Sequence, residues 1–175
     1  MLKRIFFLLV ELYYRLTLNC VGYAKKRGVK VGKHCEFFTR DFGSEPYLIE
    51  IGNHVQITSG VKFFTHGGGW ILREKYPNFD FLGKIVIGDN VYIGNNALFM
   101  PGVTVGNNVI VAAGAVVTKS ITDNVIVGGN PAKIIGNIEN FEHKILPYQL
   151  DMNGMTFKRK KEYLLSLFDN KFVKK

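Results

Sequence analysis

The chain has 175 residues, of which 47% are hydrophobic and 21% charged, a balance that predicts one globular domain with a core of its own. Its two cysteines, Cys20 and Cys35, suggest neither a disulfide framework nor a zinc site, so the cytoplasm is the expected compartment. The net charge of +9 gathers at residues 25–27 and 158–175 and predicts an anionic partner. We expect no nucleic acid, because the sequence contains no recognition helix, RNA-binding sheet signature or zinc finger.

Residues 1–28 are expected to form an amphipathic helix followed by a linker. The uninterrupted apolar run there, residues 5–10, is far shorter than the ~20 residues that a membrane span requires. No small-residue cleavage site follows it, so a signal peptide is not expected. Two roles remain open for residues 1–18. The helix either caps the end of the fold or packs on a neighbouring subunit, or it makes peripheral contact with the inner face of the membrane.

Six-residue units repeat in unbroken register over residues 87–122. Within each unit the first position is large and apolar, and the fifth is apolar and often smaller. The fourth position is Asn or Gly in five of the six units, with Ser120 in the last, and Asn and Gly tolerate the positive φ of a corner. A chain that turns every six residues with its apolar positions inward is a solenoid of short parallel strands. The first positions are Ile87, Ile93, Phe99, Val105, Val111 and Val117.

The same frame reaches back toward the N-terminus. Ile51 and Ile57 begin two further units, Val31 begins an earlier one, and the sequence between residues 37 and 49 is irregular. In a solenoid of this kind, three six-residue units complete one turn, and each such turn is called a coil here. The predicted coils are residues 51–65, 87–104 and 105–122.

Two parts of the sequence leave the pattern. Residues 66–84 interrupt the coils, which predicts a loop extruded from the solenoid. After Thr122 the hexads stop, and residues 123–136 predict a strand followed by a Gly-Gly turn, with Pro131 at the exit. Residues 137–175 are expected to be a basic helical extension that includes an amphipathic helix over about residues 156–172.

Three features carry a resemblance to a known family. They are the hexads, the loop start Phe-Phe-Thr-His-Gly-Gly-Gly-Trp at residues 63–70, and the exit Gly-Gly-Asn-Pro-Ala-Lys at residues 128–133. Together they resemble the left-handed β-helix acyltransferases, in the branch of maltose, galactoside and xenobiotic O-acetyltransferases that includes sugar O-acetyltransferases of surface-polysaccharide gene clusters. The resemblance covers residues 29–136. It implies an all-β, left-handed parallel β-helix and a homotrimer with active sites between adjacent subunits. It also implies acetyl-CoA as the donor, with no metal.

His66 is the expected catalytic residue. It lies where the chain leaves the coil, which is where the family that this chain resembles places its catalytic histidine. A sugar hydroxyl is a poor nucleophile until its proton is removed, and an imidazole is suited to that task near neutral pH. The three glycines that follow allow close approach and leave backbone N–H groups free, some of which could bind the thioester oxyanion. Either Glu74 or Asp80 is a candidate to orient His66, and the sequence does not choose between them.

The resemblance also places the acetyl-CoA site along the outside of the last coils. The positions that match the family's contacts are Asn95, Ala113, Thr118, Lys119 and Lys133. The two lysines among them would meet the phosphates of the nucleotide as point charges. A basic position that the branch often has after the second lysine is a glycine here, so the basic tail is a candidate substitute.

Trp70 and Tyr92 are the candidates for binding the acceptor, because flat aromatic faces stack on the apolar face of a sugar ring. Tyr92 is also one of four apolar residues at outward-facing sixth positions, where a ladder of apolar side chains predicts burial against a partner. These residues are Tyr92, Leu98, Ile110 and Val116.

The remaining chemistry-bearing residues favour other roles. His34 and His54 occupy fourth positions and are expected at corners, and the spacing of the histidines does not match the zinc ligands of a γ-type carbonic anhydrase. An acyl-cysteine route is disfavoured because Cys35 is expected to face inward and Cys20 lies before the coils.

The sequence therefore predicts an acetyl-CoA-dependent O-acetyltransferase that uses direct transfer to a sugar hydroxyl. The acceptor would be a nucleotide-linked sugar or a glycolipid, in the biosynthesis of a surface polysaccharide such as capsule, O-antigen or exopolysaccharide. N-acetylation of a nucleotide amino-sugar and acetylation of a xenobiotic remain alternatives within the enzyme class. A non-catalytic β-helix scaffold is the alternative of another class.

Overall fold

The computed structural model describes Thr17 and residues 19–174, so the helix expected over residues 1–18 lies almost wholly outside the described residues. The chain divides into two compact units, residues 1–138 and residues 139–175. Within the part that the structure describes, no helix is long and apolar enough to cross a bilayer.

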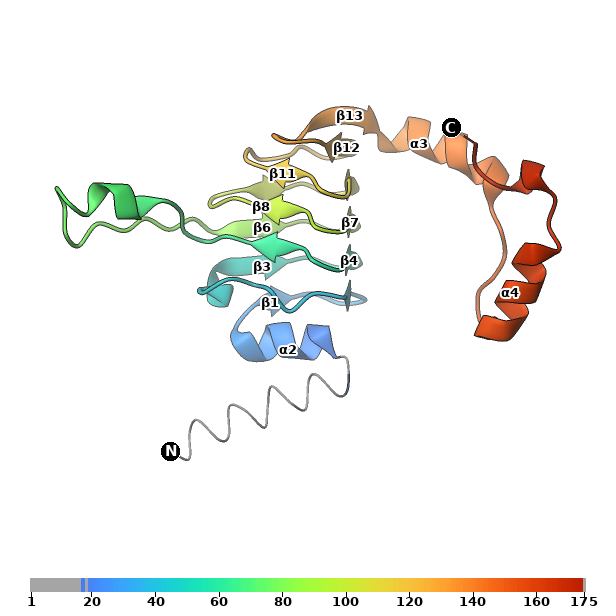
Figure 1. The fold of residues 1–175 in the computed structure, drawn as a ribbon, viewed down its shortest axis with the longest axis horizontal. Coiled ribbons are helices and arrows are strands. Elements are labelled where there is room, and N and C mark those ends of the chain that lie inside the picture. The colour runs from blue at the N-terminus through green and yellow to red at the C-terminus, as the bar shows by residue number, and fades with distance from the viewer. Residues whose placement is uncertain (1–16, 18, 175) are drawn as a thin grey trace. The chain divides into compact units, whose positions relative to one another are not determined.

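Short parallel strands stack into three sheets that wind around one core (Figure 1). Sheet A consists, in spatial order, of β1 (Lys30–Val31), β3 (Ile49–Ile51), β6 (Ile85–Ile87) and β9 (Thr104–Val105). Sheet B consists of β2 (Glu36–Phe37), β4 (Val55–Ile57), β7 (Val91–Ile93), β10 (Val109–Val111), β12 (Val125–Gly128) and the antiparallel edge strand β13 (Lys133–Asn137). Sheet C consists of β5 (Lys62–Phe63), β8 (Leu98–Phe99) and β11 (Val116–Val117). This arrangement is a parallel β-helix.

Strand pairing gives the length of one coil. Ile87 pairs with Val105 and Ile93 pairs with Val111, so equivalent residues of adjacent coils are eighteen positions apart. Three hexads per coil, as predicted, account for this spacing. The first and fifth positions of the regular hexads are buried together, so the apolar period of the sequence corresponds to the inside of the solenoid.

Amide side chains form a ladder along the corner between sheets A and B. The fourth-position residues adopt positive φ, which confirms the corner role predicted for His34 and His54 as well as for the asparagines. His54 Nδ1 lies 2.8 Å from Asn90 Oδ1. Asn90 Nδ2 donates to Asn108 Oδ1 at 2.8 Å, and Asn108 Nδ2 donates to Asn124 Oδ1 at 3.0 Å. The residues that turn the backbone therefore also join consecutive coils.

Replacing Asn90 by alanine is expected to lower the free energy of unfolding by about 2 kcal/mol, through the strained left-handed backbone and the lost amide bonds. Asn90→Gly is the matched control, because glycine accepts the φ of 55° and removes only the amide. We expect the glycine variant to lose roughly half as much, about 1 kcal/mol. Urea unfolding of both variants measures the difference. Wild-type stability in both would contradict a stabilising role for the ladder.

The last coil corrects one prediction about the hexads. Val105 bridges to Ile121, and Val111 pairs with Val127, so these partners are only sixteen positions apart. The sixth hexad, predicted as residues 117–122, is therefore wrong. The chain makes a four-residue unit and then a complete hexad that begins at Ile121 and has its positive-φ corner at Asn124. An isoleucine suits both the first and the fifth position, which is why the apolar pattern alone misplaced the phase.

Helix α2 (Cys20–Arg27) occupies part of the segment predicted as a linker. The Asn19 side chain caps its start by accepting a hydrogen bond from Gly22 N at 2.7 Å, and Gly28 ends it with a φ of 104°. Tyr23 and Ala24 are buried in the same core cluster as the first strands. The first coil is therefore covered by residues 20–27.

The second unit is helical. It contains most of α3 (Ile138–Ile145), the 3-10 helix η3 (Leu146–Tyr148), α4 (Phe157–Leu165) and the 3-10 helix η4 (Asp169–Lys171). The helix expected over about residues 156–172 begins as predicted with Thr156 as its cap, but it ends at Leu165, where the Ser166 N–H bonds back into the last turn. Helix α3 lies within the extension that is expected to be helical, although the sequence pattern assigned it no bounds of its own.

Candidate active site

The chain leaves the solenoid at the end of β5, above a stack of buried phenylalanines. The Phe63 ring lies between Phe42 and Phe99, with centroid separations of 5.7 and 5.1 Å. Beyond it Thr65 is buried, and its carbonyl accepts from Gly83 N at 2.8 Å. His66 then forms an antiparallel bridge with Leu82, which closes the base of the loop. The stack and the bridge together hold His66 where the chain leaves the coil. The long loop that follows extends away from the stacked strands (Figure 1).

A second segment, from the irregular stretch between β2 and β3, approaches the same point. Gly43 has a φ of 67°, and a Cβ there would lie 2.6 Å from the carbonyl oxygen of Phe63. Only glycine satisfies both the conformation and this approach. Two residues later Glu45 precedes the 3-10 helix η1 (Pro46–Leu48), and its carboxylate reaches Thr65 and His66. The coil before the loop thus supplies a carboxylate to the base of the loop.

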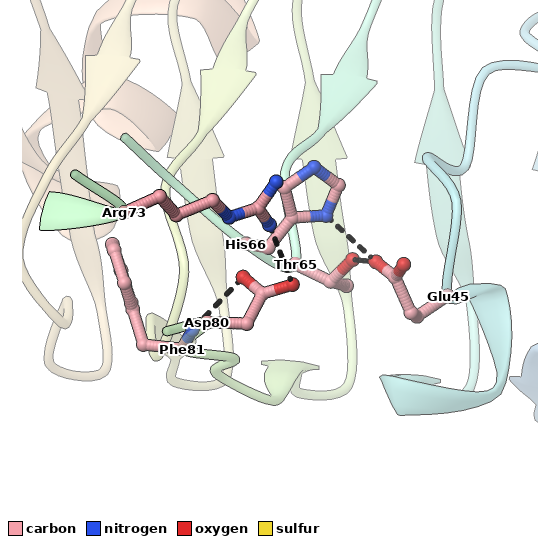
Figure 2. A network of polar contacts seen from close by, with 6 residues as sticks. All are labelled: Glu45, Thr65, His66, Arg73, Asp80 and Phe81. Atoms are coloured by element: carbon pink, nitrogen blue, oxygen red, sulfur yellow. Dashed lines mark hydrogen bonds and ion pairs between the residues drawn. The ribbon is translucent and has the colours of Figure 1, made fainter. Parts of the chain in front are cut away.

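Glu45 Oε2 accepts two hydrogen bonds (Figure 2). Thr65 Oγ1 donates to it at 2.5 Å, and His66 Nδ1 lies 2.9 Å away. The bonds from Thr65 and then from His66 lower the pKa of Glu45 below its ordinary value of 4.5, outweighing the opposing effect of desolvation. The carboxylate is therefore ionised at neutral pH and can only accept, so Nδ1 is the nitrogen that donates to it. In the neutral imidazole this arrangement leaves the lone pair on Nε2. The His66 side chain is 45% exposed, so solvent and substrate can reach it.

The carboxylates that the sequence analysis favoured for orienting His66 do not do so. Asp80 lies 3.4 Å from the Arg73 guanidinium, and Arg73 Nε also donates to the Phe79 carbonyl at 3.1 Å, which braces the loop internally. Glu74 lines a pocket with Trp70 and Arg73 near the helix η2 (Gly69–Leu72). The carboxylate bonded to His66 is Glu45, twenty-one positions earlier in the chain.

The glycines after His66 are not equivalent. A Cβ on Gly67 would lie 2.6 Å from the Phe81 ring, so glycine permits the two sides of the loop to approach closely. Gly69 N donates to the Gly67 carbonyl at 2.9 Å, so this N–H is not among the glycine N–H groups that could bind an oxyanion.

The five residues predicted to bind acetyl-CoA lie around the β8–β11 part of sheet C, and all five are exposed. Asn95 and Ala113 occupy the corner before these strands, on adjacent coils. Thr118 and Lys119 directly follow β11. Lys133 begins β13, just after a turn that bonds to Val116 of β11 through the Gly129 carbonyl and the Ala132 N–H, at 3.0 and 2.8 Å.

His66 follows β5, and β5 pairs with β8, which pairs with β11. It therefore leaves from the same end of sheet C as Thr118 and Lys119. The structure thus brings His66 and part of the predicted acetyl-CoA site to one corner of the solenoid.

The two aromatic residues predicted to bind the acceptor lie on different elements. Trp70 belongs to the loop and is 78% exposed, with the Arg73 guanidinium 5.8 Å from its ring centroid. Tyr92 lies on the outer face of sheet B, between Gln56 and Ile110 of the neighbouring strands. Within a single chain, Tyr92 therefore lies on sheet B, whereas His66 follows a strand of sheet C.

Neither cysteine lies at the His66 corner. Cys20 is buried in α2. Cys35 is half-buried rather than fully inward, and its Sγ donates to the Gly52 carbonyl at 3.2 Å at the corner between sheets A and B. Among Thr17 and residues 19–174, no three His, Cys, Asp or Glu side chains gather as a metal site.

Comparison with known proteins gives the class of this chain. The family described as bacterial transferase hexapeptide (six repeats) matches residues 84–119. Protein CapG of Staphylococcus aureus is 56% identical over 148 residues, which cover 82% of this chain and 86% of that protein. The galactoside O-acetyltransferase of Escherichia coli K12 is 36% identical over 98 residues, or 55% of this chain and 47% of the relative, so the match spans about half of that enzyme. The chain belongs to the bacterial hexapeptide-repeat transferases.

Solved structures narrow the class further. A maltose O-acetyltransferase from Clostridium difficile 630 aligns with a TM-score of 0.58 at 31% identity, over 63% of this chain and 59% of that one. A hexapeptide-repeat acetyltransferase from Vibrio cholerae, complexed with acetyl coenzyme A, aligns with a TM-score of 0.53 at 28% identity, over 63% of this chain and 61% of that one. The chain is an acetyltransferase with the β-helical fold of this family, and the second of these neighbours binds acetyl coenzyme A.

Proposed function

We propose that the protein transfers acetyl from acetyl-CoA to a hydroxyl group of a sugar, with His66 as the general base. The observation that carries this proposal is the pair formed by Glu45 and His66, in which Nδ1 faces the carboxylate and the half-exposed ring of the neutral histidine would offer the Nε2 lone pair at the corner shared with Thr118 and Lys119. The acceptor is a nucleotide-linked sugar or a glycolipid from which a surface polysaccharide is built. Residues 29–136 carry the reaction, and residues 137–175 form a separate extension.

His66 performs both proton transfers of this reaction. Nε2 takes the proton of the acceptor hydroxyl as the oxygen attacks the thioester carbonyl, and it returns that proton to the departing thiolate sulfur. The products are an acetyl ester and the free thiol of CoA, so no proton is gained or lost. Glu45 holds Nδ1–H throughout and stabilises the imidazolium that forms between the two steps. Transfer is direct, since both cysteines lie away from this corner.

The active protein is a homotrimer with sites between adjacent subunits. Two observations support this part of the proposal. Tyr92 lies on sheet B of its own chain, so it joins a site at His66 only when a neighbouring subunit brings it there. The apolar residues Leu98, Ile110 and Val116 face outward from sheets B and C, where a neighbour would cover them. In such a site Trp70 and Tyr92 would hold the sugar between two subunits.

Lys119 and Lys133 bind the phosphates of CoA in this proposal. Replacing either lysine by glutamine is expected to raise the Kd for acetyl-CoA at least about tenfold, because a charge-assisted hydrogen bond contributes about 1.5–3 kcal/mol. Isothermal titration measures the change. Lys33→Gln, which removes an exposed lysine at the corner between sheets A and B, is the matched control. An unchanged Kd in both variants would move the phosphate site elsewhere, with the basic tail as the next candidate.

The experiment that tests the proposed function combines binding with transfer. Titration with acetyl-CoA establishes the donor site without knowledge of the acceptor. The release of CoA thiol is then followed with free sugars, nucleotide sugars, lipid-linked sugars, amino-sugars and chloramphenicol. Ester formation on a sugar that depends on His66 supports the proposal. Amide formation on an amino-sugar, or transfer to chloramphenicol alone, would replace it with the corresponding alternative.

We also propose that the enzyme works in the cytoplasm, with residues 1–18 in peripheral contact with the inner face of the membrane. The basis is the sequence alone, since this segment lies outside the described residues apart from Thr17. Such a contact would bring the enzyme to the membrane, where a glycolipid acceptor lies.

A further inference from the structure

The C-terminal unit lacks a core. No residue from 139 to 174 is buried, and the unit has fewer than the ~40 residues that a self-sufficient domain usually needs. Three large apolar side chains are exposed in or next to α4: Phe157 at 85%, Leu165 at 76% and Phe168 at 81%. The apolar surface of such side chains contributes to stability only when another surface covers it.

The exposed face of α4 mixes apolar and cationic side chains. At 3.6 residues per turn, Phe157, Lys161 and Leu165 follow one another at intervals of four on one face, and Lys158 lies beside Lys161, three positions before it. All four are exposed, whereas Tyr163 and Leu164 are half-buried. Within the described residues, none of the four basic residues at 158–161 forms an ion pair. The face therefore presents unpaired positive charge beside uncovered apolar surface.

We infer that α4, together with Phe168, is a binding element for an anionic lipid surface. Phe157, Leu165 and Phe168 would enter the boundary between headgroups and acyl chains. Lys158 and Lys161 would lay their methylene stems on the same apolar layer and place their ammonium groups among anionic headgroups. An anionic lipid surface suits this face better than a second copy of the chain does, because each copy carries a net charge of +9 and would repel the other.

The residues of this surface are separate in the sequence from the proposed catalytic pair and from residues 1–18. A single weak membrane element binds reversibly, and stable attachment takes two. The helix α4 and the N-terminal segment would be two such elements at opposite ends of the sequence. Binding of the full chain to vesicles is therefore expected to weaken when either is altered.

The test is sedimentation of the full-length protein with phosphatidylcholine vesicles that contain phosphatidylglycerol. Lys158→Gln combined with Lys161→Gln is expected to weaken binding roughly 10- to 30-fold, from the attraction that each basic residue contributes near an anionic surface. Phe157→Ser combined with Leu165→Ser is expected to weaken it at least about tenfold, through lost apolar burial. Pure phosphatidylcholine vesicles should bind the wild-type protein far more weakly, and added salt should lower binding to the anionic vesicles.

Two matched variants show whether the effect belongs to α4. Lys33→Gln with Lys84→Gln removes the same charge from the β-helix, and Ile134→Ser with Ile135→Ser removes exposed apolar surface from β13. Both should bind the vesicles as the wild type does. Deletion of residues 1–18 measures the contribution of that segment separately. Light scattering and a thermal melt confirm that each variant keeps its mass and fold.

Unchanged vesicle binding in both α4 variants would overturn the inference. So would a loss of equal size in the β13 variant, which would indicate unspecific adhesion. If the Phe157 and Leu165 variant instead changed the mass in solution and left vesicle binding intact, the face would be an interface between copies. Acetyl transfer to a water-soluble acceptor should be unchanged in the variant of Phe157 and Leu165, so a failure of this inference is separable from a failure of the proposed function.

Discussion

Replacement of His66 by alanine is expected to lower the turnover number for acetyl transfer about 1,000-fold. This factor corresponds to about 4 kcal/mol of lost transition-state stabilisation. The reason is that no other described side chain at this corner is both bonded to Glu45 and able to accept a proton near neutral pH. The Kd for acetyl-CoA should stay within about twofold, because His66 acts on the reacting hydroxyl rather than on the nucleotide end of the donor.

His54→Asn is the matched control for this measurement. Both histidines bond through Nδ1 to a side-chain oxygen, but His54 bonds to an amide at a structural corner, where asparagine stands in other coils. Its replacement should leave turnover nearly unchanged. Transfer is measured with the best acceptor of the sugar panel, and titration with acetyl-CoA is run on the same preparations. Wild-type turnover in the His66 variant would remove it as the base, whereas lost donor binding would point to a misplaced loop.

The β-helix could be predicted from the sequence because each coil repeats the same physical requirements. An apolar residue must face inward at the first and fifth positions, and a residue that accepts positive φ must stand at the fourth. Where the repeat shortens after Val117, the apolar pattern no longer determines where the next hexad begins. Ile121 satisfied the apolar requirement in either phase, and only the pairing with Val105 settles which phase the chain adopts.

The candidate site was predictable only in part, for a different reason. His66 stands at the break in the repeat, so its position was visible in the sequence. Glu45 was not, because it lies in the irregular stretch before β3, where no period assigns a direction to a side chain. The one local signal was Gly43, whose positive φ permits the close approach to Phe63. From that glycine one could have predicted a constrained turn in this stretch. One could not have predicted which histidine the turn approaches.

Glu45→Gln should cost about 100-fold in turnover with little change in the KM for either substrate. A glutamine has nearly the same shape, but it can turn its amide N–H toward His66 Nδ1 and so favour the tautomer with its proton on Nε2. That tautomer cannot accept a proton from the acceptor. The neutral side chain also removes the charge that stabilises the imidazolium. Nitrogen NMR of labelled imidazole should report the proton on Nδ1 in the wild type and on Nε2, in part, in the variant.

Glu74→Gln makes the same chemical change on the loop, at a carboxylate that does not contact His66, and it should keep wild-type turnover. The pH dependence of stability separates the two positions as well. The folded pKa of Glu45 lies below its ordinary value of 4.5, so its bonds stabilise the fold above that pH and are lost as the pH falls through the lowered pKa. Between neutral pH and pH 4.5 the Glu45 variant should therefore be less stable than the wild type, and the difference should shrink in stronger acid. If Glu74→Gln slowed transfer as much as Glu45→Gln, the loop carboxylate would be acting on His66 in the working enzyme, and Glu45 would serve the fold alone.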